Sequence, residues 1–234
     1  MNQKIFKLSN SINFSYFSVN VLKLDEEKPE IRKTGTTTVA LVCKDGVVLA
    51  AEKKSTMGYL VASKESEKIL PVEDHIALTI AGASGDAQAL VRYLKAELKL
   101  FAIQNRRKIS VKGASTLLAN ILQNGRWAYM PYMVQLIIAG YDTGPAIFTL
   151  DAIGSVEQEK KFFSTGSGSP MALGVLENRY KEGMSVEEGS KLATDAIKSA
   201  IERDIGSGGR GIDVVVINKE GIKKTSHDFE RILK

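Results

Sequence analysis

Two unlike parts of the sequence meet at the stretch Lys33-Thr34-Gly35-Thr36-Thr37-Thr38-Val39. If the bond between Gly35 and Thr36 is cut, Thr36 becomes an amino terminus with a hydroxyl nucleophile (Oγ) and an α-amine, whose ordinary pKa is about 7.7–8.0. Such an amine can act as the base for its own side chain in covalent catalysis. β-Branched residues also favour strands, so the stretch fits the plain start of a β-strand as well. Taken alone, it leaves both interpretations open.

The residues before the junction, 1–35, do not have the pattern of a folded domain. A signal peptide needs an unbroken apolar centre of about 7–15 residues, whereas polar residues interrupt every apolar run in Ser9-Asn10-Ser11-Ile12-Asn13-Phe14-Ser15-Tyr16. A charged stretch with a proline follows at 24–30. We expect a flexible leader; a tail that packs on a partner and an over-long reading frame are the alternatives.

The composition is that of one ordinary globular domain, because 44% of the 234 residues are hydrophobic and 25% are charged. The net charge of +5 comes from basic residues scattered among acidic ones, which gives nucleic-acid binding little support. No apolar run approaches the roughly 18 residues of a membrane span. Cys43 is the only cysteine, which excludes an internal disulfide and favours an intracellular, cytoplasmic protein.

Apolar patterning downstream of the junction predicts groups of strands and helices. Residues 37–43 and 47–51 form an expected hairpin, for which Asp45-Gly46 is a favoured turn pair, and a polar connection follows at 52–58. Further strands are expected at 59–62, 68–70, 75–81, 134–139, 146–150, 155–163 and 212–217. Helices are expected at 86–104 capped by Asp86, at 111–124 ended by Gly125, at 171–180, and at 185–204 opened by a capping box.

The order of these elements predicts the fold class. Strands, two helices, strands, two helices and strands follow one another, which indicates an α+β plan of antiparallel sheets with helices packed outside them. Regular alternation of strand and helix is missing, which argues against a doubly wound parallel sheet.

Nucleotide and metal sites have weak support. Residues 206–211 match Gly-x-Gly-x-x-Gly, but they follow a helix and precede a strand, which is the reverse of a dinucleotide site, and residues 166–169 lack the lysine of a phosphate loop. His75, expected inside an apolar strand, and His227 have no second donor at ligand spacing. We therefore expect no metal, no cofactor and no histidine-based triad. Cys43 is expected to be a small core residue.

A catalyst without histidine needs an amine or a carboxylate as its base, and the junction supplies an amine. A nearby lysine would favour the neutral amine by like-charge repulsion and would stabilise anionic charge on Oγ. Position alone does not choose among the 32 Lys and Arg residues.

Seven stretches in order along the chain resemble the signatures of proteasome β-subunits. Thr36-Thr37-Thr38-Val39 resembles the start of the mature subunit, and Tyr129-Met130-Pro131-Tyr132-Met133-Val134-Gln135-Leu136 resembles the archaeal version. The other stretches are 43–50, 55–58, 80–88, 165–170 and 203–209. The resemblance runs from Thr36 to about Ile217.

This resemblance implies the four-layer αββα fold of the N-terminal nucleophile hydrolases. It implies a propeptide at 1–35, removed autocatalytically, and a catalytic domain at 36–234. The implied protein is a cytoplasmic threonine endopeptidase that degrades unfolded proteins. Its implied partners are other β-subunits and α-subunits in stacked seven-membered rings, with an AAA ATPase regulator that acts through the α-ring.

The resemblance also implies a role for individual residues. Thr36 matches the nucleophile, and Lys68 and Glu52 match the catalytic lysine and the acidic position after the second strand. Asp204, Ser207 and Ser167 match residues that orient the threonine and its amine, and the N–H of Gly82 matches the oxyanion hole. Positions that line the pocket for the substrate residue before the cut bond, P1, are matched by Ser55, Leu70, Ile80 and Ser84, which favours an apolar P1 residue.

Plainer interpretations exist for each of these residues and for the whole chain. Lys68 fits a solvated surface charge, Asp204 a helix-end residue, and the two serines ordinary turn residues. The chain could be an unprocessed, inactive structural subunit of the ring, although such subunits typically lack the Gly-Thr junction or the lysine. A bacterial two-ring threonine protease is a third reading, against which Gly-Ser-Gly-Ser-Pro at 166–170 counts.

Overall fold

The structure is a computed structural model that describes residues 35–127 and 131–229. The expected leader, apart from Gly35, lies outside the described residues, as do Tyr129 and Met130. The described part contains two five-stranded antiparallel sheets, a two-stranded ribbon and four helices.

The first sheet has the strand order β10-β1-β2-β11-β12, with every pair antiparallel. Its strands are β1 Thr38–Cys43, β2 Gly46–Glu52, β10 Phe162–Thr165, β11 Gly211–Asn218 and β12 Gly221–Asp228. Cys43 pairs with Gly46, so β1 and β2 form the expected tight hairpin, but its two loop residues are Lys44 and Asp45, and Gly46 is already the first residue of β2.

The second sheet has the order β5-β6-β7-β8-β9 and is also antiparallel. Its strands are β5 Ile69–Glu73, β6 Ile76–Gly82, β7 Val134–Tyr141, β8 Pro145–Leu150 and β9 Val156–Glu159. Two short strands, β3 Ser55–Met57 and β4 Leu60–Ser63, form the separate ribbon.

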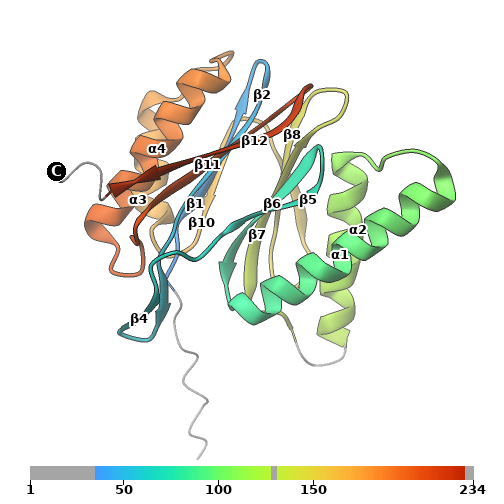
Figure 1. The fold of residues 1–234 in the computed structure, drawn as a ribbon, viewed down its shortest axis with the longest axis horizontal. Coiled ribbons are helices and arrows are strands. Elements are labelled where there is room, and N and C mark those ends of the chain that lie inside the picture. Colours follow the sequence, from blue (N-terminus) through green and yellow to red (C-terminus); the bar gives the residue numbers. More distant parts are fainter. Residues whose placement is uncertain (1–34, 128–130, 230–234) are drawn as a thin grey trace, which may run out of the picture. The chain divides into compact units, whose positions relative to one another are not determined.

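Three hydrophobic clusters define four layers. Between the sheets, Ala40 and Leu49 of the first sheet pack with Ala77 and Ile137 of the second. Helices α3 Ser169–Arg179 and α4 Val186–Arg203 cover the other face of the first sheet, and α1 Ser84–Asn105 and α2 Val111–Trp127 cover the second. Figure 1 shows the two helix pairs on opposite sides of the sheets. The expected four-layer αββα sandwich is confirmed.

Strand periodicity puts side chains on both faces of each sheet, which explains this packing. Val39 and Leu41 face the helices, whereas Ala40 between them faces the second sheet. A strand buried on both faces reads as a continuous apolar run, as residues 39–43 do.

Several local predictions are wrong. Residues 155–163 were expected as one strand, but β9 and β10 belong to different sheets. Residues 52–58 were expected as a connection, but they contain β3.

The helix boundaries also differ from expectation at two points. Asp86 does not cap α1, because its carboxylate accepts the N–H of Met133 at 2.9 Å and the N-cap is Ala83. Gly125 does not end α2, which continues to Trp127. The predicted capping box at Ser185 is present, with reciprocal bonds to Glu188.

Candidate active site

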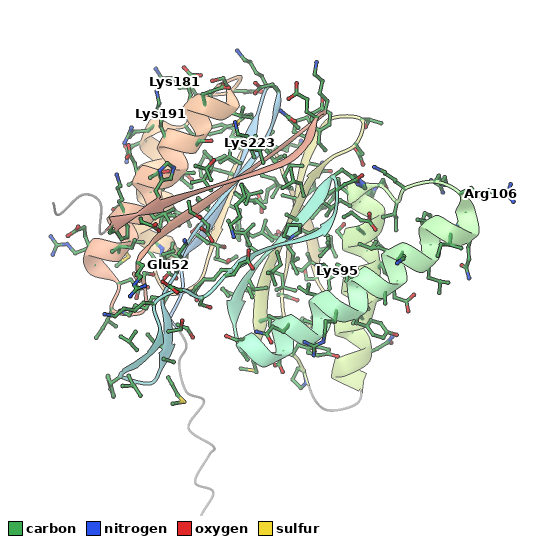
Figure 2. The ribbon with its side chains drawn as sticks, viewed as in Figure 1. Glu52, Lys95, Arg106, Lys181, Lys191 and Lys223 are labelled. Atoms are coloured by element: carbon green, nitrogen blue, oxygen red, sulfur yellow. The ribbon has the colours of Figure 1, made fainter. Side chains whose placement is uncertain are left out.

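Sheet register brings the expected site residues to one end of the sandwich. Thr36 lies just before β1, and the antiparallel pair Thr38–Ala51 places it beside Glu52 at the end of β2. The pair Thr38–Thr165 places the following loop, which holds Ser167, on its other side. Figure 2 shows Glu52 at this end of the strands, whereas Lys181 and Lys191 lie with the outer helices.

The hydroxyl of Thr36 lies between a lysine and a carbonyl. Lys68 Nζ donates to Thr36 Oγ1 at 2.7 Å, and Oγ1 donates to the carbonyl oxygen of Gly35 at 2.6 Å. Thr36 is 4% exposed and Lys68 is 5% exposed. The interpretation of Lys68 as a solvated surface charge is therefore wrong.

Glu52 is the ionic partner of Lys68. Its Oε1 lies 2.8 Å from Lys68 Nζ. The carboxylate also accepts the backbone N–H groups of Thr37, Lys54 and Gly208 at 3.2, 2.6 and 3.1 Å. Four donors thus hold one buried carboxylate, which offsets part of the cost of removing its charge from water.

Burial moves both members of this pair toward their neutral forms. Burial lowers the pKa of Lys68, and the nearby charge of Glu52 opposes that change only in part. Burial also raises the pKa of Glu52, against the opposing charge and hydrogen bond of Lys68. A lysine with a lowered pKa can exchange a proton with the hydroxyl that it contacts.

A second group of contacts surrounds the backbone nitrogen of Thr36. This nitrogen donates to Ser167 Oγ at 3.2 Å, and Ser167 Oγ donates to Asp204 Oδ2 at 2.7 Å. Ser207 Oγ donates to the same oxygen at 2.6 Å. The structure thus brings Ser167, Ser207 and Asp204 together on the side of Thr36 that would become the α-amine.

The bond between Gly35 and Thr36 passes very close to another backbone segment. A Cβ atom on Gly35 would lie 2.0 Å from Cα of Gly206, and a Cβ on Gly206 would lie 2.3 Å from Cα of Gly35. The N–H of Gly35 donates to Thr56 Oγ1 at 3.0 Å. Only glycine fits at either position without displacing backbone.

A small pocket opens beside Thr36. Of the expected substrate-binding residues, Ser55, Ile80 and Ser84 line it, together with Gly82, which has a φ of +117°. Leu70 is not part of the lining and packs instead against the core under α1 and α2. Sequence reasoning missed Ser66, which lines the pocket, and Thr37 and Thr56, whose hydroxyl groups contact the site.

His75 and its neighbours differ from expectation. His75 lies in the turn between β5 and β6, not inside a strand, and ligand-type atoms of Glu73, Asp74 and His75 lie within 4.8 Å of one another. However, Nδ1 of His75 contacts Asp74 and Nε2 contacts the carbonyl of Ile109, both at 3.0 Å. The group lies at the opposite end of β6 from Gly82. Cys43 is a core residue as expected, and burial raises its pKa to about 12.

Comparison with known proteins identifies the family. The protein-family model described as "Proteasome subunit" matches residues 32–217 of this chain. This chain belongs to the proteasome subunit family. Proteins named proteasome subunit beta are similar to it along most of their length. The one from Methanocaldococcus vulcanius is 52% identical over 83% of this chain and 86% of its own.

Other archaeal members of the family agree. The proteasome subunit beta of Methanohalophilus mahii is 53% identical over 81% of this chain and 90% of its own. That of Archaeoglobus profundus is 50% identical over 85% of this chain and 92% of its own. The resemblance to archaeal proteasome β-subunits is thus confirmed. Among the described residues, no helix of this proteasome subunit has the length and apolar character needed to cross a membrane.

Proposed function

We propose that this chain is a catalytic proteasome β-subunit, a threonine endopeptidase whose nucleophile is Thr36 Oγ1. The observation that carries the proposal is the position of this hydroxyl. It accepts a hydrogen bond from Lys68 at 2.7 Å and contacts the carbonyl of the bond to be cut at 2.6 Å. A threonine that merely began a strand would need neither contact.

The first reaction of the proposed enzyme removes the leader, residues 1–35. Thr36 Oγ attacks the carbonyl carbon of Gly35, the bond from that carbon to the nitrogen of Thr36 breaks, and the hydroxyl proton passes to this nitrogen. The product is an ester between Gly35 and Thr36. Water then hydrolyses the ester, which leaves a carboxylate on Gly35 and a free amine and hydroxyl on Thr36.

The second reaction is peptide cleavage by the chain 36–234. The freed amine, supported by Lys68, takes the proton of Oγ as Oγ attacks a peptide carbonyl, and it gives this proton to the leaving nitrogen as the peptide bond breaks. Water then hydrolyses the ester left on Oγ, which releases the second product and restores Thr36. The N–H of Gly82 stabilises the charge that develops on the carbonyl oxygen. The pocket of Ser55, Ile80 and Ser84 carries no charged side chain besides Lys68, which favours an apolar P1 residue.

Assembly follows from the family. In this proposal the chain forms seven-membered rings with other β-subunits, which stack against rings of α-subunits in the cytoplasm. An AAA ATPase delivers unfolded proteins through the α-ring. The family match over residues 32–217 and the relatives named proteasome subunit beta support this part.

Intact-mass measurement of particles assembled with α-subunits tests the proposal. The β-chain should begin at Thr36, and a peptide epoxyketone should add once to that chain, on Thr36. Particles that cleave peptides while every β-chain remains full length would overturn the proposal. A full-length chain in particles without activity or labelling would instead support the unprocessed, structural subunit.

A further inference from the structure

Thr37, the residue after the proposed nucleophile, contacts both the Lys68–Glu52 pair and the group formed by Ser167, Ser207 and Asp204. Thr37 is fully buried, at 0% exposed. Its backbone N–H donates to Glu52 Oε1 at 3.2 Å, the oxygen that also lies 2.8 Å from Lys68 Nζ. Its hydroxyl lies 2.6 Å from Ser207 Oγ, on the side that holds Asp204.

The direction of the bond between Thr37 and Ser207 follows from counting protons. Ser207 has a single hydroxyl proton, which it donates to Asp204 Oδ2 at 2.6 Å. The proton between Ser207 and Thr37 must therefore belong to Thr37. Ser167 also donates to Asp204 Oδ2. Two series of hydrogen bonds therefore end on this carboxylate oxygen, one through Ser167 and one through Thr37 and Ser207.

These two series of hydrogen bonds lie on either side of the peptide unit that joins Thr36 and Thr37. Ser167 accepts the Thr36 N–H at 3.2 Å, and the Thr37 hydroxyl donates into Ser207. Between them, the carbonyl oxygen of Thr36 accepts the N–H of Gly168 at 3.3 Å. The fit is close, since a Cβ on Gly168 would lie 2.0 Å from Thr37 Oγ1.

Cleavage changes what holds Thr36 in place. Before cleavage the chain is fixed on both sides of Thr36, because the N–H of Gly35 donates to Thr56 Oγ1. After cleavage this upstream contact is gone, and Thr36 is joined to the protein only through Thr37. The hydrogen bond of the Thr37 hydroxyl then has a larger influence on the positions of Thr36 Oγ and the α-amine of Thr36.

We propose that Thr37 is a positioning residue for the mature nucleophile, acting through its hydroxyl bond to Ser207 and its N–H bond to Glu52. The inference rests on the proposed peptidase function of Thr36. Because Thr37 is not among the residues that line the pocket, its hydroxyl affects the chemical step and not peptide binding. Loss of the Thr37 hydroxyl lowers the rate of peptide cleavage more than the extent of leader removal.

The variant Thr37→Val removes the hydroxyl and keeps the shape of the side chain. The full chain is expressed with its α-subunits, and intact mass gives the fraction of β-chains that start at Thr36. Labelling by a peptide epoxyketone counts active sites, and kcat and KM for an apolar fluorogenic peptide are expressed per labelled site. We expect leader removal to go to completion, KM to stay unchanged and kcat per site to fall about tenfold, as misplaced reacting groups require.

Two further variants separate positioning from stability. Thr37→Ser keeps the hydroxyl and should restore kcat. Thr79→Val removes another fully buried hydroxyl, which contacts Thr38 Oγ1 at 3.1 Å, and should leave kcat and KM per site unchanged. Equal kcat per site in Thr37→Val and the parent chain would overturn the proposal, as would failure of Thr37→Ser to restore kcat.

The remaining outcomes are also decisive. If Thr37→Val does not assemble, Ser207→Ala removes the acceptor of the same bond, and an unchanged kcat per site in that variant overturns the proposal. If the parent chain is processed and labelled, but Thr37→Val has the same kcat per site as the parent, the role of Thr37 is overturned and the proposed function is not. If the parent chain is neither processed nor labelled, the proposed function itself fails.

Discussion

The amino group of Lys68 lies 2.8 Å from the carboxylate of Glu52, although their side chains are only 6% and 0% exposed. Burying two charges is costly unless other polar groups satisfy them. Here Thr36 Oγ1 accepts from the lysine, and three backbone N–H groups donate to the carboxylate. The pair therefore holds a lysine with a lowered pKa against one hydroxyl.

Replacing Glu52 by Gln should change how the reaction depends on pH. Burial lowers the pKa of Lys68, and the negative charge of Glu52 raises it part of the way back. Without that charge the pKa of Lys68 falls further, so the rise of the epoxyketone labelling rate with pH should move to lower pH. The maximal rate should fall at least about tenfold, because the lysine loses its orienting partner.

Rates of labelling measured across a pH series test this prediction. The matched control is Glu65→Gln, which removes an exposed carboxylate that pairs with Arg210. It should not move the profile. A profile for Glu52→Gln that moves to higher pH, or does not move, contradicts the proposal that the protonation state of Lys68 supports proton transfer from Thr36 Oγ.

Replacing Thr36 by Ala should leave the leader in place. The variant lacks the only side-chain hydroxyl that contacts the Gly35 carbonyl among the described residues. Intact mass should show full-length chains in assembled particles, with no epoxyketone labelling. Thr36→Ser keeps a hydroxyl and should be processed, though its Oγ is less restricted than that of threonine. Peptide cleavage by the Ala variant would place the nucleophile elsewhere.

Replacing Gly206 by Ala should block leader removal more than peptide cleavage. The added Cβ would lie 2.3 Å from Cα of Gly35, a backbone atom that leaves with the leader, and 3.0 Å from Ser167 Oγ, a side-chain atom that has only to shift by a few tenths of an ångström. Intact mass should show the leader retained, whereas the same variant expressed from Thr36 onward should recover labelling. Gly174→Ala, where the new Cβ would meet no atom within 4 Å beyond its chain neighbours and the nearby backbone of its own helix, should behave as the parent chain. Normal processing of Gly206→Ala would argue that this close approach does not matter.

Replacing Asp213 by Asn should lower stability near neutral pH. Asp213 is 3% exposed, and its carboxylate lies 3.1 Å from Lys53 Nζ and 3.2 Å from Lys224 Nζ. Burial raises the pKa of Asp213, but its bonds to Ser226, Lys53 and Lys224 outweigh burial and leave the pKa below its usual 3.8. Loss of the charge should cost about 1–3 kcal/mol of unfolding free energy.

The sign of the pH dependence follows from the lowered pKa. The charged carboxylate stabilises the fold above its unfolded pKa of about 3.9, and this contribution disappears as pH falls through the lower folded value. Urea unfolding at several pH values should therefore show the difference between parent and Asp213→Asn shrinking below about pH 4. Asp195→Asn breaks an exposed pair with Arg179 and should cost under about 1 kcal/mol.

Local signals in the sequence predicted the elements whose cause is local. The turn stretch Lys44-Asp45-Gly46 predicted the β1–β2 hairpin, although Gly46 itself belongs to β2, and Ser185 with Glu188 predicted the start of α4. The elements it missed depend on distant partners. β12 is largely exposed and carries Lys223 and Lys224, so it has no apolar pattern, yet it pairs with β11 along its whole length. Asp86 was predicted to cap α1, but its carboxylate accepts the backbone N–H of Met133, which lies far along the chain.

The sequence by itself determined the grouping of strands and helices and singled out Thr36 as a candidate nucleophile, because periodicity and the Gly-Thr junction are local properties. It did not choose among 32 Lys and Arg residues, and only the resemblance pointed to Lys68. The tertiary structure placed Lys68 Nζ 2.7 Å from Thr36 Oγ1 and showed the contacts of Thr37. The reason is physical: sheet register decides which side chains meet, and register depends on contacts between segments far apart in the chain.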